Sequence, residues 1–178
     1  MDYFEFFEIP VSFHLDNADL KQRFLQKSRQ FHPDFFTLAG EEKQAEVLEL
    51  STLNNEAYRT LSDPDKRMGY ILQHLGLIAE EGKNEVPQDF LMDMMDLNEA
   101  LMELEFGFDE SVFEKAKNDL AQIEMALSNE VAPYLERFDA NKPNLAELET
   151  IKDFYFKKRY LWRIQENLDR FAPVSKET

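Results

Sequence analysis

Apolar residues recur every three or four positions through much of this chain, and that period limits what it can fold into. The clearest run steps through Phe90, Met94, Leu97, Leu101 and Leu104. Because an α-helix turns about 100° per residue, such steps place the apolar side chains on one face of a helix. Glycine is scarce, and Leu, Glu, Met, Lys and Ala dominate the long segments, which favours helices over sheets. The sequence therefore predicts an all-α fold.

Proline and capping signals divide the first 76 residues into shorter helices. We expect helices over residues 2–8, 17–31, 41–61 and about 65–74. Pro33 disfavours helical geometry at His32, so the second helix should end there. The second and third helices then form a hairpin.

The next segment, residues 77–86, is charged, includes Gly82 and has no sustained period, which is typical of a linker. Pro87 suits the first turn of the following helix. Three long helical patterns come after it, with a kink or break expected at Pro133 and a cap at Asn144. We predict a helical-hairpin domain over 1–76, a linker over 77–86 and a three-helix bundle over 87–178.

Composition argues against several functions. The chain has no cysteine, and its three histidines are far apart in sequence, so we expect no metal and no cofactor. No Ser/His/Asp order or glycine-rich phosphate loop stands out, so we expect no enzyme. A net charge of −16 disfavours nucleic acid and anionic membranes as partners. The acidic start and the lack of a ~20-residue apolar stretch predict a cytoplasmic protein.

The tripeptide His32-Pro33-Asp34 stands between the two helices of the predicted hairpin. The helix before it carries four bases against one acid, a local charge of +3 in an acidic chain. These bases are Lys21, Arg23, Lys27 and Arg29. A charge run usually marks a solvated face, and His32 could simply cap a helix, but a local reversal of sign is less ordinary.

A second candidate surface lies on the predicted helix after Pro87, whose inward apolar stripe is already complete. Left over on the far side are Leu91, Met92, Met95, Met102, Asp96, Glu99 and Glu103. An apolar patch edged by carboxylates suits a partner-binding surface, and methionine adapts its shape to a partner. The alternative is a helix that is buried on both faces.

A third cluster is basic and aromatic. It comprises Lys157, Lys158, Arg159 and Arg163, interleaved with Tyr155, Tyr160 and Trp162. Such mixtures can bind nucleic acid. In an acidic bundle, pairing with neighbouring acidic helices and a solvated face is favoured instead.

Residues 2–75 resemble a J-domain, in which a His-Pro-Asp loop after a basic helix stimulates ATP hydrolysis by a DnaK-type chaperone. Leu25 and Gln26 follow Phe24, where general J-domains often carry Lys and Arg. The surrounding pattern is closer to the HscB family of iron–sulfur co-chaperones. The resemblance implies a chaperone-binding set of His32, Pro33, Asp34, Arg23, Lys27 and Arg29.

The similarity to the HscB family extends to the C-terminal half. It implies that the leftover face binds IscU, the scaffold on which iron–sulfur clusters are assembled. The matching positions are Leu91, Met92, Met95, Asp96, Glu99 and Glu103, with Phe156 of the last helix as a further aromatic. Met95 and Asp96 are conservative departures from the family's commoner Leu and Glu.

The leading hypothesis is a non-catalytic co-chaperone that delivers an IscU-type scaffold to an HscA-type ATPase. One alternative is a J-domain protein that serves a different client. Another is a helical adaptor in which the His-Pro-Asp tripeptide is accidental.

Overall fold

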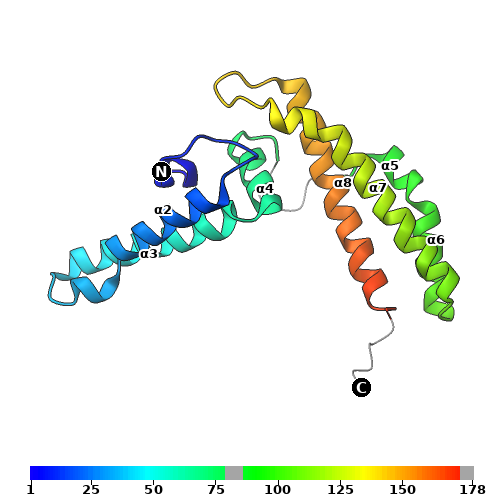
Figure 1. Ribbon diagram of the computed structural model, residues 1–178, viewed down its shortest axis with the longest axis horizontal. Helices are drawn as coiled ribbons and strands as arrows, with labels where there is room; N and C mark the ends of the chain where they lie inside the picture. Colours follow the sequence, from blue (N-terminus) through cyan, green and yellow to red (C-terminus); the bar gives the residue numbers. More distant parts are fainter. Residues whose placement is uncertain (79–85, 173–178) are drawn as a thin grey trace. The chain divides into compact units, whose positions relative to one another are not determined.

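The computed structural model describes residues 1–78 and 86–172. Every regular element in these ranges is helical (Figure 1), which confirms the all-α prediction. Contacts between Cα atoms divide the chain into two compact units, Met1–Gly76 with Glu136–Pro143, and Leu77–Leu135 with Asn144–Thr178. Of the predicted linker 77–86, residues 79–85 lie outside the described residues.

The first unit departs from the predicted domain in one segment. Residues Glu136–Pro143 belong to this unit, although the sequence assigned them to the bundle. The physical reason is aromatic packing, since the Phe138 ring lies edge-on to the Phe13 ring with 4.7 Å between centroids.

The helices of the first unit begin where local capping groups are available. They are α1 (Tyr3–Phe7), α2 (Asn17–Gln30), the 3-10 helix η1 (Pro33–Phe36), α3 (Glu41–Leu61) and α4 (Pro64–His74). Asp2 and Glu5 form a reciprocal capping box on α1. Asp16 accepts two backbone N–H bonds at the start of α2, and Asp63 does the same for α4.

Helices α2 and α3 run antiparallel, side by side, as a long hairpin (Figure 1). Leu20, Ala57 and Leu61 are buried between helices of this unit, and burial of each large apolar side chain stabilises the fold by about 1.5–3 kcal/mol. The Phe24 ring stacks on Tyr58 with 4.3 Å between centroids. These contacts pack α2 against α3 along the hairpin.

Arg67 of α4 is a buried cation in this unit. Its Nε donates to the carbonyl of Phe13 at 3.0 Å, and its Nη1 donates to the carbonyl of Leu61. Loss of hydration on burial lowers the pKa of Arg67. The guanidinium thus ties the end of α3 to the segment that links α1 and α2.

The second unit is built from α5 (Gln88–Asp93), α6 (Met95–Phe106), α7 (Glu110–Glu136) and α8 (Leu145–Asp169). Its core joins the predicted stripes of three helical segments. The buried members are Phe90, Met94, Leu97, Leu101, Leu104, Phe113, Ala116, Leu120, Leu161, Ile164 and Leu168. Helices α5 to α8 lie together as a bundle (Figure 1), in which α6 contacts α8.

One expectation about these helices was wrong. The single helix predicted after Pro87 is divided at Met94, where φ and ψ are −88° and 1°. The Asn98 side chain explains the turn, because its Nδ2 donates to the Met94 carbonyl at 2.9 Å and to the Tyr160 hydroxyl at 2.9 Å. Helix α7 continues through Pro133 to Glu136, so the chain does not break there, and a kink at Pro133 stays a prediction.

Candidate functional site

The His-Pro-Asp tripeptide lies at the exposed end of the hairpin. His32 has extended backbone geometry and caps η1, with its Nδ1 accepting a hydrogen bond from the Asp34 N–H at 3.3 Å. The Asp34 side chain is 81 % exposed and the His32 side chain 51 %. Both side chains are therefore accessible to a partner.

Two amide side chains of α3 support this end of the hairpin. Asn54 is buried, and its Nδ2 donates to the Phe24 carbonyl at 3.2 Å and to Ser28 Oγ at 2.9 Å. Gln44 Nε2 donates to the carbonyls of Thr37 and Ala39. The first amide fixes α2 against α3, and the second fixes the turn after η1. Both were missed in the sequence, where an amide among polar residues gives no sign of its partners.

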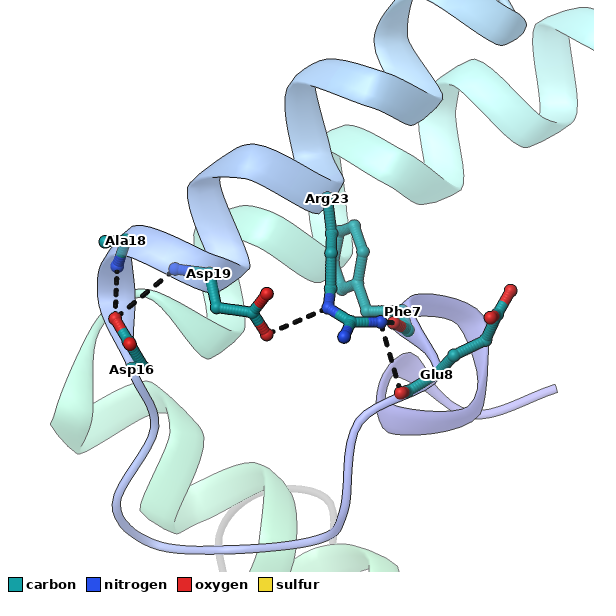
Figure 2. Close-up of polar contacts among 6 residues, drawn as sticks. All are labelled: Phe7, Glu8, Asp16, Ala18, Asp19 and Arg23. Atoms are coloured by element: carbon teal, nitrogen blue, oxygen red, sulfur yellow. Dashed lines mark hydrogen bonds and ion pairs between the residues drawn. The ribbon is translucent and has the colours of Figure 1, made fainter.

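Arg23 has a structural role that its place in a basic run did not reveal. Its Nη1 donates to the carbonyls of Phe7 and Glu8 at 2.9 and 3.3 Å, and its Nε pairs with Asp19 at 2.9 Å (Figure 2). Glu8 ends α1 in the left-handed conformation, with φ of 57°. A cation that binds the last carbonyls of a helix also complements the helix dipole. Arg23 therefore caps α1 and fastens it to α2.

Lys27 also contacts α1, whereas Arg29 does not. The Lys27 Nζ lies 4.7 Å from the centroid of the Phe6 ring and 3.9 Å from Glu8 Oε1, and its side chain is mostly buried. Arg29, near the end of α2, is exposed. Of the three predicted chaperone-binding cations, two thus hold the fold together, and Arg29 has the most accessible charge.

The outer face of α5 and α6 combines apolar and acidic side chains. Met92 is 61 % exposed and Met95 57 %, and Leu91 and Met102 are exposed as well. Burial of this helix on both faces is therefore excluded. Asp96, Glu99 and Glu103, on the same face by helical geometry, are also exposed. We call this set, Leu91, Met92, Met95, Asp96, Glu99, Met102 and Glu103, the α5–α6 face.

A shallow hollow of about 440 Å³ borders the α5–α6 face. Its lining includes three carboxylates, Asp93 and Asp96 from one side and Asp119 of α7 from the other, around the apolar side chains of Leu97 and Ile123. The acidic edge of the face thus extends onto α7. A basic side chain on a partner would be attracted to this edge.

Phe156 does not share that exposure. Its side chain is 7 % exposed and its ring lies edge-on to Tyr155, with 5.4 Å between centroids. Helix α8 buries residues around more of its circumference than one stripe, and Phe156 is among them. Phe156 is therefore not accessible at the surface in the described fold.

The basic and aromatic run of α8 also makes contacts within the unit. Lys157 Nζ lies 5.5 Å from the centroid of the Phe90 ring, and Arg159 lies 5.6 Å from that of Tyr155. These distances are in the range of cation–π attraction. This part of the run therefore contributes to packing through aromatic rings, and the expected pairing with neighbouring acidic helices stays a prediction.

Other site types are not found in the described part of the chain. Residues 1–78 and 86–172 contain no group of three or more His, Asp or Glu side chains placed to hold a metal ion. None of the helices in the same ranges has the length and hydropathy needed to cross a membrane.

Comparison with known proteins identifies the family. Residues 86–169 match the family model described as the HSCB C-terminal oligomerisation domain. A "Co-chaperone protein HscB homolog" of Vibrio vulnificus strain YJ016 is 34 % identical over 72 % of this chain and 81 % of that relative. This chain belongs to the HscB co-chaperone family. The human "Iron-sulfur cluster co-chaperone protein HscB" is 30 % identical over 94 % of this chain and 67 % of its own length.

A solved structure supports membership of the HscB family at the level of fold. The crystal structure of human co-chaperone protein HscB superposes with a TM-score of 0.74 at 28 % identity, covering 96 % of this chain and 81 % of the human one. The helical hairpin and the bundle of this HscB-family protein are therefore features of a known fold.

Proposed function

We propose that this HscB-family protein is a co-chaperone of iron–sulfur cluster assembly with two binding surfaces. One is the His32-Pro33-Asp34 end of the hairpin, which stimulates ATP hydrolysis by an HscA-type chaperone. The other is the α5–α6 face, which binds an IscU-type scaffold and brings it to that chaperone. No catalysis is assigned to the chain itself, and it acts in the cytoplasm.

The observation that carries the proposal is the exposed pair His32 and Asp34 at the end of a braced hairpin. Asp34 carries a negative charge that α2, with its basic residues, does not neutralise by a direct contact in the described fold. A partner that binds the exposed part of α2 would therefore also meet this carboxylate. The name of the human relative, an iron–sulfur cluster co-chaperone, supports the choice of pathway.

The α5–α6 face supports the scaffold half of the proposal. Its exposed methionines and leucine lie among carboxylates, and the neighbouring hollow adds two more carboxylates. Interfaces combine an apolar centre with a polar rim. A scaffold with a basic, partly apolar surface would complement this face. The buried Phe156 is not part of the proposed surface.

A steady-state ATPase assay with an HscA-type chaperone tests whether the His32-Pro33-Asp34 end of the hairpin stimulates ATP hydrolysis. The full chain should raise the rate of ATP hydrolysis, and Asp34→Asn should leave the chaperone at its basal rate because the carboxylate is lost. Glu49→Gln is the matched control, since it removes one exposed charge from α3 of the same hairpin and should stimulate like the parent. Equal stimulation by Asp34→Asn and the parent would refute the proposed role of the loop.

A further inference from the structure

Two large apolar side chains follow the tripeptide, Phe35 in η1 and Leu38 in the turn after it. Hydrogen bonds with 3-10 spacing run from the Phe35 N–H to the His32 carbonyl and from the Ala39 N–H to the Phe36 carbonyl. They hold Phe35 close to the tripeptide. The Phe35 ring lies beside the His32 ring, with 5.6 Å between centroids.

Both apolar side chains are open to solvent. Phe35 is 74 % exposed and Leu38 is fully exposed, so neither side chain contributes much to the packing of the hairpin. By contrast, Phe36 and Ala39, on the side of η1 toward α3, are partly buried. Large apolar side chains left outside the core next to a functional residue indicate a binding surface.

A hollow lies on another side of the same turn. It has a volume of about 330 Å³, and its lining includes Pro33 and Asp34 of the tripeptide together with Leu48 of α3. Leu48 is 60 % exposed. Exposed apolar side chains of η1 and α3 thus lie next to the tripeptide that is proposed to stimulate ATP hydrolysis.

We infer that Phe35, Leu38 and Leu48, here called the tip patch, dock into an apolar recess on the ATPase chaperone. This inference rests on the proposed function and specifies a further part of the same interface. A protein that contacts His32 and Asp34 must approach this end of the hairpin, where Phe35 lies beside His32 and Leu48 lines the same hollow as Asp34. The charged residues around the tip patch predict the charges around the recess on the chaperone. That surface should be acidic where it meets the exposed Arg29 and basic where it meets the exposed Glu41 and Glu42.

The tip patch and the tripeptide contribute to different quantities, the patch to affinity and the tripeptide to the rate of ATP hydrolysis. Burial of Phe35 and Leu38 supplies affinity, because apolar surface leaves water on binding. Asp34 acts only once the complex has formed. Loss of the patch should therefore raise the concentration of co-chaperone needed for half-maximal stimulation, while the rate at saturation stays the same.

ATPase titrations with the full chain and an HscA-type chaperone test this division. The variant Phe35→Ser with Leu38→Ser should raise the half-maximal concentration about tenfold or more, as expected for two interface anchors. Phe35→Leu with Leu38→Met keeps the patch apolar and should stay within about twofold of the parent. Met125→Ser, on an exposed methionine of α7, controls for the loss of surface hydrophobicity and should behave like the parent.

The outcomes separate this inference from the proposed function. If the serine double variant has an unchanged half-maximal concentration while Asp34→Asn still abolishes stimulation, the function stands and the tip patch is refuted as a docking surface. A lower rate at saturation without a change in half-maximal concentration also refutes it, because the patch would then act in triggering. If the parent chain gives no stimulation, the proposed function and this inference both fail. Far-UV circular dichroism should show equal helix content in all variants, since the substituted side chains are exposed.

Discussion

The hairpin and the bundle differ in which side chains their folds leave free. On α2, the basic residues Arg23 and Lys27 are held by carbonyls, a carboxylate and an aromatic ring of α1. On α5 and α6, Met92 and Met95 project into solvent although they are apolar. A charged residue is thus not necessarily available to a partner, and an apolar residue is not necessarily part of the core. The contacts of each side chain decide between fold and binding.

We expect the largest effect of a substitution on the α5–α6 face, where it should appear as a loss of affinity for the scaffold. Leu91→Ala with Met95→Ala should weaken binding of an IscU-type scaffold about 30- to 100-fold, because two central apolar contacts are lost. Titration calorimetry measures this change. The urea midpoint of the variant should match that of the parent, since neither side chain lies in the core.

A control in the same unit tests the specificity of that loss. Met125→Ala with Leu145→Ala removes two exposed apolar side chains from α7 and α8 and should bind scaffold like the parent. Unchanged affinity in the Leu91 and Met95 variant would exclude the α5–α6 face as the scaffold-binding surface. A lowered urea midpoint would show instead that these side chains support the fold.

The second largest effect is expected for Arg23, and it should lower the free energy of unfolding. Arg23→Gln removes the cap on the α1 carbonyls and the pair with Asp19, and we expect a loss of about 1 kcal/mol in the free energy of unfolding. Urea unfolding followed by far-UV circular dichroism measures it. Lys21→Gln changes the same charge at an exposed site of the same helix and should leave the midpoint unchanged. Equal midpoints for the two variants would mean that Arg23 is not a structural cap.

Local signals made much of the fold predictable. The caps at Asp2, Asp16 and Asn144 act over two or three residues, so the chain shows both partners within one turn. The apolar period likewise places the core residues of α5 to α8. The Leu91 and Met95 side chains are exposed, as that period expected, because the opposite face already fills the core.

Contacts across long sequence separations could not be predicted. The turn at Met94 depends on Asn98, whose side chain reaches the Tyr160 hydroxyl 62 positions later in the chain. The cap on α1 comes from Arg23, 16 residues after Phe7. Phe156 is buried because α8 is covered on more than its main stripe. Helical periodicity alone cannot give such partners, and the roles of the tripeptide came from a family resemblance.

The smallest effect is expected at Arg29, the exposed cation of the predicted set. Arg29→Gln should change the free energy of unfolding by less than about 0.5 kcal/mol, since the side chain is at the surface. It should raise the half-maximal concentration for ATPase stimulation about two- to fivefold, and added salt should reduce the difference because charges at an interface rim are screened. ATPase titrations at low and high salt measure both quantities. The same titrations with Arg23→Gln complete the comparison: if Arg23→Gln shows the larger salt-sensitive change and Arg29→Gln none, then the half-buried cation contacts the chaperone, and the division between structural and binding charges on α2 is wrong.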